Sequence, residues 1–293
     1  MNLNFTSREK KKTNEIKINI NDNVLIKGKV ITQVFKFKSI LEICNFLNKI
    51  ESNIRLKVLI NYKNNEFYIF KTKNNNKKNH SQENQISNQE IASLFKSFYS
   101  EDKFKLDNFT IKNTKKIKYE IAPKNFEIHD NYLLTENRYI NVIYLDYLGE
   151  ILNIKNIIKN MDCWLSIDCY KVNREFILSK LYEMKEDNVI EKKFTDFILN
   201  KIDHIMEKIN KENILQCEIK MLLYNSDLNY INNENKIIKE NISKNYCTSY
   251  TPQEKMNTRK LFEKCIYPNL SMDIIHSITD SDLFKLIGVD TNV

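Results

Sequence analysis

The sequence predicts an α+β protein: a ferredoxin-like antiparallel sheet covered by helices, with a helical insertion and a small β-α-β unit before it. Three observations predict this fold. Residues 163–170 and 215–223 alternate apolar and polar side chains, which is the period of a strand with one buried face. Residues 151–161 and 228–242 repeat apolar residues every three or four positions, as amphipathic helices do. Glycine and proline occur only three times each, so turns and helix ends depend on Asn and Asp.

The first elements form a small unit over residues 18–70, after a polar tail at residues 1–17 that we expect to be disordered. Residues 18–37 indicate two short strands around an Asn-Asp-Asn turn. Ser39 is placed as the N-cap of a helix, because apolar residues then recur at helical spacing. Residues 54–62 alternate like a strand, which completes a β-α-β unit.

A larger domain is predicted over residues 89–250, beyond a linker or long loop at residues 71–88 that is rich in Asn, Lys, Ser and Gln. Residues 132–148 indicate a hairpin or a long strand. Residues 176–209 predict a helical hairpin inserted between the two strongest strands, with a break at Asp187-Asn188.

The order of elements in this domain is β-α-β, helical insertion, β-α-β, with a last short strand at residues 246–250. This order is the ferredoxin-like plan. Residues 251–293 are expected to form a C-terminal helical segment.

Charge and composition restrict the function only weakly. The chain has 46 basic and 38 acidic residues, a net charge of +8, and its abundance of Asn, Lys and Ile is typical of an A+T-rich genome. Such a balance permits contact with nucleic acid or an anionic membrane without requiring either. No apolar run approaches the about 20 residues of a membrane span. We therefore expect a cytoplasmic protein, at most peripheral at the inner face of the membrane.

The six cysteines include no CxxC pair, and we expect reduced, mostly buried thiols rather than a disulfide framework or a metal site.

A nucleotide-binding loop is excluded by the glycine content. A Walker A loop needs two glycines and a Lys-Ser or Lys-Thr, so that backbone amides can wrap a phosphate. The three glycines of the chain, Gly28, Gly149 and Gly288, are more than a hundred residues apart. The sequence therefore excludes ATP hydrolysis, and no cofactor is predicted.

A metal-dependent nuclease is the enzymatic alternative. Glu218-Ile219-Lys220 lies on a predicted strand and Asp168 on a neighbouring one, an arrangement that could hold a cation and a water molecule. In a chain so rich in Lys, Glu-x-Lys also arises by chance, as at Glu15-Ile16-Lys17. We therefore predict no catalytic residue and no metal site.

A candidate interaction face consists of Trp164, Tyr170 and Lys171. Trp164 and Tyr170 lie on the side of their strand opposite Cys163 and Cys169, with Lys171 beside them. Aromatic and basic side chains on an open sheet could stack nucleobases and bind phosphates. The alternative, which we favour, is that helices or a partner cover this face.

Across residues 119–286 the order of features resembles the N-terminal, non-motor domain of the conjugation and type IV secretion ATPases of the VirB/TraC/TraE type. The segments that carry the resemblance are Ile121–Pro123, Asn131–Tyr139, Ile143–Tyr147, Trp164–Tyr170, Ile214–Tyr224 and Ile266–Pro268. The chain departs from the family pattern at Leu148-Gly149-Glu150, where a proline is expected, and it lacks the Walker A and B motifs of the motor. No catalytic residue is carried over.

The resemblance implies a docking role. The expected function is that of a non-catalytic component of a conjugation or type IV secretion (DNA transfer) machine, a stand-alone or split portion that works beside a separate P-loop ATPase. The implied partners are that ATPase and membrane subunits of the secretion channel, and a homo-oligomer is left open. The alternative is a nucleic-acid-binding accessory protein of a plasmid, phage or virus with an A+T-rich genome.

Overall fold

The computed structural model describes a large part of the chain. The described residues are 18–21, 24–27, 30–50, 54–73, 85–87, 89–91, 94, 117–119, 127–129, 132–134, 138–148, 152–191, 196–245, 247–250, 264–266 and 272–289. The predicted tail at residues 1–17 lies outside them, as do residues 74–84 and 88 of the predicted linker.

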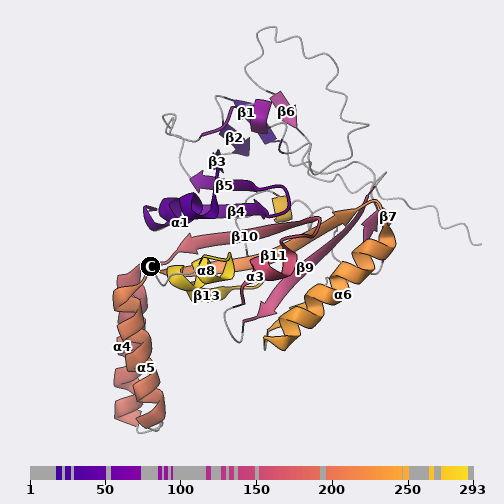
Figure 1. Ribbon diagram of the computed structural model, residues 1–293. Coiled ribbons are helices and arrows are strands. Elements are labelled where there is room, and N and C mark those ends of the chain that lie inside the picture. Colours follow the sequence, from indigo (N-terminus) through magenta and orange to yellow (C-terminus); the bar gives the residue numbers. More distant parts are fainter. Residues whose placement is uncertain are drawn as a thin grey trace, which may run out of the picture.

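A single antiparallel sheet joins the strands of the described residues (Figure 1). Its six long strands follow the order β3 (Val30–Phe37), β5 (Glu66–Lys73), β4 (Arg55–Asn61), β10 (Cys163–Lys171), β11 (Ile214–Asn225) and β9 (Tyr139–Tyr147). Short strands extend it beyond β3: β2 (Val24–Lys27), β1 (Ile18–Asn21) and β6 (Ile117–Tyr119). Others extend it beyond β9: β8 (Leu133–Leu134) and β7 (Glu127–Ile128). Finally, β12 (Thr248–Tyr250) pairs with β9 and β13 (His276–Thr279) with β11.

The middle of the sheet is built from two similar halves. In the first, α1 (Ile40–Asn48) connects β3 to β4, and β5 lies between these two strands. In the second, α3 (Ile154–Ile158) connects β9 to β10, and β11 lies between them. Antiparallel pairing of β4 with β10 joins the halves, with Lys57 opposite Asp168. The unit predicted over residues 18–70 therefore shares its sheet with the later domain.

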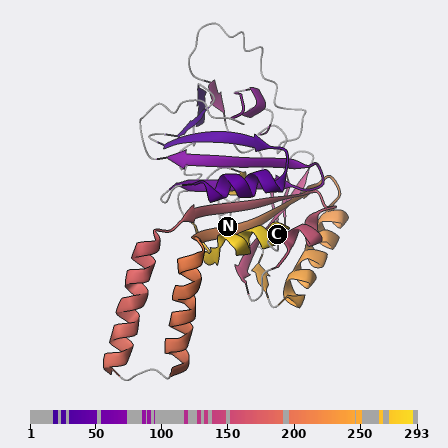
Figure 2. The same cartoon turned by 60° about the vertical axis from the view of Figure 1, so that its left-hand side comes forward.

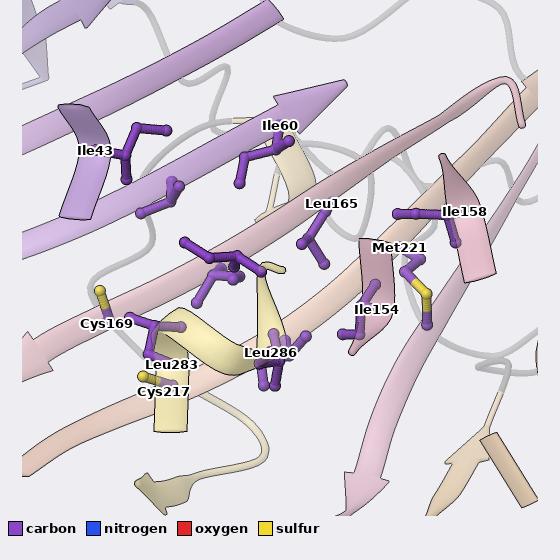
Figure 3. Close-up of a cluster of buried hydrophobic side chains, with 14 of the residues drawn as sticks. Ile43, Ile60, Ile154, Ile158, Leu165, Cys169, Cys217, Met221, Leu283 and Leu286 are labelled. Carbon is purple, nitrogen blue, oxygen red and sulfur yellow. The ribbon is translucent and has the colours of Figure 1, made fainter. Parts of the chain in front are cut away.

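Four helices cover one face of this sheet: α1, α3, α6 (Leu228–Lys244) and α8 (Asp280–Leu286). Their apolar side chains pack with those of the strands into one large cluster, part of which is drawn in Figure 3. Each helix begins at a residue whose side chain accepts a hydrogen bond from a backbone amide of the first turn: Ser39, Asn153, Asp227 and Thr279. Polar side chains thus cap the N-termini of these four helices.

A second, smaller apolar cluster lies on the opposite face. Val34, Tyr68, Trp164 and Leu222 contribute to it from four strands. Two short segments cover them: the region of Ile86, Ile91 and Leu94, and the short helical segment that carries Cys265 and Ile266. Both faces of the central strands are therefore buried.

The helical insertion forms an arm that projects from the body, as Figure 2 shows. Its helices are α4 (Arg174–Glu191) and α5 (Asp196–Lys211), which follow β10 and precede β11. Helix α4 continues past the predicted break at Asp187-Asn188. Asp and Asn cost only about 0.5 kcal/mol each in a helix interior, too little to end a helix by themselves.

The structure confirms the α+β class with an antiparallel sheet. The C-terminal region, predicted to be helical, contributes β13 as well as α8. Among the helices described, none is both long enough and apolar enough to cross a membrane.

Candidate functional site

The three residues of the candidate interaction face lie at different depths along β10. Trp164 is 2% exposed and belongs to the second cluster, with its ring centroid 6.2 Å from that of Tyr68. A side chain at this depth has no surface left on which a base could stack. Tyr170 and Lys171 are half-buried at the far end of the strand. The structure therefore does not bring the three side chains together on an open surface.

Tyr170 and Lys171 already have partners within the chain. The hydroxyl of Tyr170 hydrogen-bonds with Gln216, and the guanidinium of Arg55 lies 5.7 Å from the centroid of the Tyr170 ring. The Nζ of Lys171 lies 3.5 Å from the carbonyl oxygen of Ile50. These contacts hold both side chains against the sheet.

An open depression of about 350 Å³ lies where the arm leaves the sheet. Lys171, Arg174, Glu175 and Asn213 are among its lining residues. The lining mixes basic, acidic and amide side chains, and the Arg174 guanidinium donates to the carbonyl oxygen of Glu212 at 3.4 Å. The depression thus has no single charge that would select a ligand.

The residues considered for a nuclease do lie together, in a buried charge cluster of Lys57, Asp168, Glu218 and Lys220. Asp168 stands directly opposite Lys57 on β4 and opposite Glu218 on β11. Its Oδ2 accepts hydrogen bonds from Lys57 at 2.8 Å and from Lys220 at 2.7 Å. Lys220 also donates to Glu218 at 2.5 Å. All four side chains are at most 2% exposed.

A cover segment, the described residues 264–266 and 272–274, closes this cluster from solvent. Lys57 donates to the carbonyl oxygens of Lys264 at 2.9 Å and Cys265 at 3.3 Å. Glu218 Oε1 accepts from the backbone amides of Asp273 at 2.7 Å and Ile274 at 3.2 Å. Because the cluster satisfies backbone groups at both ends of the segment, these charges anchor it to the sheet.

Ser166 adds another anchor. Its hydroxyl donates to the carbonyl oxygen of Cys265 at 2.7 Å and accepts from Lys57 at 2.9 Å.

The charges in the cluster balance, with two ammonium groups facing two carboxylates. Burial raises the pKa of Asp168, but the ammonium groups of Lys220 and Lys57 outweigh it and hold that pKa below its ordinary value. Burial lowers the pKa of Lys220, yet the carboxylates of Asp168 and Glu218 bring it above the usual value for lysine. For Lys57, burial dominates, so its pKa lies below the ordinary one even though Asp168 opposes the shift.

The cluster acts as a structural anchor that holds the cover segment on the sheet. A cation at Asp168 would have to displace the ammonium groups that occupy its Oδ2. Within the described part of the chain, no group of three or more His, Cys, Asp or Glu side chains is placed to hold a metal ion.

Lys57 is the member that the sequence analysis missed. It was visible only as one of the polar positions in the alternation of residues 54–62. Nothing local in the sequence relates it to Asp168, because the register between β4 and β10 joins positions far apart in the chain.

The arm carries most of the exposed apolar side chains. Six large hydrophobic residues are exposed in the described chain, and four of them lie on α4 or α5: Phe176, Tyr182, Met184 and Ile205. Phe176 is 61% exposed, whereas Ile202, Met206 and Ile209 of α5 are buried. Exposed apolar groups of this size, gathered on one projecting element, are typical of protein–protein contacts.

Several charged side chains on the arm form ion pairs with one another. Lys185 bonds to Asp203 at 2.6 Å and so links the two helices. Lys211 bonds to Glu207 at 2.7 Å along α5. The charges in these pairs neutralise one another, so the exposed apolar side chains distinguish the surface of the arm.

Comparison of the sequence with protein-family models and with curated proteins finds no match.

Proposed function

We propose that this chain is a non-catalytic docking component of a conjugation or type IV secretion machine, and that the α4–α5 arm contacts its partner. The observation that carries the docking role is the arm, which projects from the sheet and presents Phe176, Tyr182 and Met184 to solvent. Burial of one such side chain at an interface contributes about 1.5–3 kcal/mol.

We assign the kind of machine from the resemblance of residues 119–286 to the non-motor domain of the secretion ATPases. Within that region, the unit from β9 to β12 is proposed to be ferredoxin-like. Its support is the order β12-β9-β11-β10, antiparallel throughout, with α3 and α6 packed in the same apolar cluster. Counted along the chain, β9, β10, β11 and β12 are the first to fourth strands of this unit. Their order in the sheet is therefore fourth, first, third, second, which is the order of a ferredoxin-like sheet.

The partner that this proposal names is a separate P-loop ATPase of the secretion machine. We expect its reading frame beside the one that encodes this chain. The two proteins are co-expressed with a tag on the ATPase and purified in mild detergent, and the amount of this chain retained is measured. Retention of the unaltered chain is the expected result.

Two variants locate the contact. Phe176→Ser is expected to lower retention at least tenfold, because it removes an exposed apolar group from the arm. Leu41→Ser is the matched control, since Leu41 is 59% exposed but lies on α1. Equal losses in both variants, or no retention of the unaltered chain, would contradict the proposal. Tight, salt-dependent binding to single-stranded DNA without any ATPase contact would instead favour the nucleic-acid-binding alternative.

A further inference from the structure

Two cysteines stand opposite each other on the adjacent strands β10 and β11, near the base of the arm. Cys169 on β10 is the register partner of Cys217 on β11, and both are fully buried in the first apolar cluster. Figure 3 shows them on neighbouring strands close to α8. Side chains that stand directly opposite each other in an antiparallel pair have Cβ atoms about 4.5–5.5 Å apart, so the two thiols are neighbours on one face of the sheet.

The hydrogen-bond pattern places this pair at a non-hydrogen-bonded position of the ladder. Near one end of the two strands, Tyr224 donates its amide to the carbonyl of Asp162, and near the other, Val172 donates to Ile214. Directly opposite residues alternate between hydrogen-bonded and non-hydrogen-bonded pairs along an antiparallel ladder. Counting residue pairs from either end of the two strands, the pair formed by Cys169 and Cys217 is non-hydrogen-bonded.

This position suits a disulfide. In non-hydrogen-bonded pairs the Cα atoms are about 4.5 Å apart and the side chains approach each other closely. A disulfide accepts Cα separations of about 4.4–6.8 Å, so the bond can form without moving the strands apart.

Cys169 and Cys217 are the one pair of cysteines that stand opposite each other in the strand registers of the described residues. Cys163 stands opposite Leu223 on β11, and the remaining three lie outside the long strands, in α1 or in connecting segments: Cys44, Cys247 and Cys265. The fold thus singles out one pair among six thiols.

We propose that Cys169 and Cys217 are a redox pair that forms a cross-strand disulfide by exchange with a low-molecular-weight disulfide such as oxidised glutathione. The thiol of one cysteine attacks oxidised glutathione, which gives a mixed disulfide and one reduced glutathione. The second cysteine then attacks the mixed disulfide at the protein sulfur, forms the intramolecular bond and releases a second reduced glutathione. The two thiol protons leave with the two glutathione molecules, and the glutathione disulfide is the oxidant.

The bond would close the base of the arm. The loop from residue 169 to residue 217 contains both α4 and α5, and the two cysteines lie only a few residues from the points where the arm leaves β10 and β11. A covalent link here fixes the strand ends that carry the arm.

Burial controls the rate of this exchange. Burial, and then the neighbouring Cys169 thiol, raise the pKa of the Cys217 thiol well above its ordinary value. Since the thiolate is the attacking species, the folded protein reacts slowly, and exchange proceeds during folding or after local opening of the two strand ends.

Oxidative refolding tests the pairing. The full chain is unfolded in urea, refolded in mixtures of reduced and oxidised glutathione, quenched in acid, and treated with N-ethylmaleimide in denaturant. Peptide mapping then identifies the disulfides. The expected result is a protein with native fluorescence in which the link between residues 169 and 217 predominates. Closure of this loop should also raise its Tm by about 5–10 °C over the reduced form.

Variants separate this outcome from random pairing. Cys169→Ala and, independently, Cys217→Ala should lose the link and the rise in Tm. Cys163→Ala is the matched control, because Cys163 lies on the same strand and the same face but opposite Leu223, and it should keep both. If native protein refolds with all thiols free under conditions that oxidise the unfolded chain, or with links distributed over other cysteines, the proposal is overturned.

Discussion

Replacement of Asp168 by Asn removes the central negative charge of the buried cluster while preserving its volume. Among the described residues, Asp168 is the only carboxylate that bonds to Lys57 and Lys220 together. After the substitution Lys220 retains Glu218. Within the described part of the chain, the acceptors left to Lys57 are uncharged: Ser166 and the carbonyl oxygens of residues 264 and 265. One ammonium group is then left buried without a counter-charge.

The distances set the size of the effect. At the 2.8 Å between Lys57 and Asp168, opposite charges attract by about 6 kcal/mol at an effective dielectric constant of about 20. The loss is limited because Lys57 can give up its proton. Keeping a lysine neutral at pH 7, when the unfolded chain holds it charged, costs about 4.6 kcal/mol. We therefore expect Asp168→Asn to lower the free energy of unfolding by about 3–5 kcal/mol.

The same reasoning fixes the pH dependence of the variant. If Lys57 is neutral in the folded variant and charged in the unfolded chain, the unfolded state binds one more proton. The free energy of unfolding of the variant then rises with pH, by up to about 1.4 kcal/mol per unit between pH 7 and the ordinary lysine pKa of about 10.4. In the unaltered protein this rise should be weaker, because Asp168 opposes the downward shift of the Lys57 pKa.

Urea unfolding followed by tryptophan fluorescence measures both effects. Trp164 is the only tryptophan of the chain, and it is buried on the same strand and face as Asp168. Asp203→Asn serves as the matched control, because Asp203 is 52% exposed in its ion pair with Lys185. An exposed pair contributes less than about 1 kcal/mol. A loss for Asp168→Asn no larger than that of the control, or a loss independent of pH, would refute the account of a closed, mutually neutralised cluster.

Further predictions concern the C-terminal helix and acid stability. Thr279→Ala should lower the free energy of unfolding by about 1 kcal/mol, because Thr279 and Asp282 form a capping box at the start of α8; faster amide exchange in that helix would identify the cause. Gly288→Ala should destabilise the protein by about 1–3 kcal/mol, since Gly288 has a φ of 85° and an added Cβ would lie 2.5 Å from the side chain of Lys155. A thermal-unfolding midpoint equal to that of the unaltered chain would contradict this. Finally, the pKa of the Asp168 carboxyl lies below its ordinary value, so its contribution to stability is present above about pH 4 and is lost as the pH falls through the folded pKa. The urea midpoint of the unaltered protein should therefore fall steeply below about pH 4. The Asp168→Asn variant should lack that part of the fall.

The sequence by itself determined the class of fold and most of the elements. The alternation in residues 163–170 and 215–223 identified β10 and β11, because the period of two in a strand is a local property. The helical spacing after Ser39 and in residues 228–242 identified α1 and α6 in the same way. The scarcity of glycine predicted side-chain caps, and polar caps begin the helices of both halves of the sheet.

Only the tertiary structure decided which strands became neighbours. The pairing of β4 with β10 joins Lys57 to Asp168, and a shift of one residue in that register would have turned Lys57 to the opposite face. The contacts with the cover segment determine that Trp164 is buried and that Lys57 and Glu218 bond to a backbone rather than face solvent. These outcomes depend on contacts between segments far apart in the chain, and a local period carries no information about them.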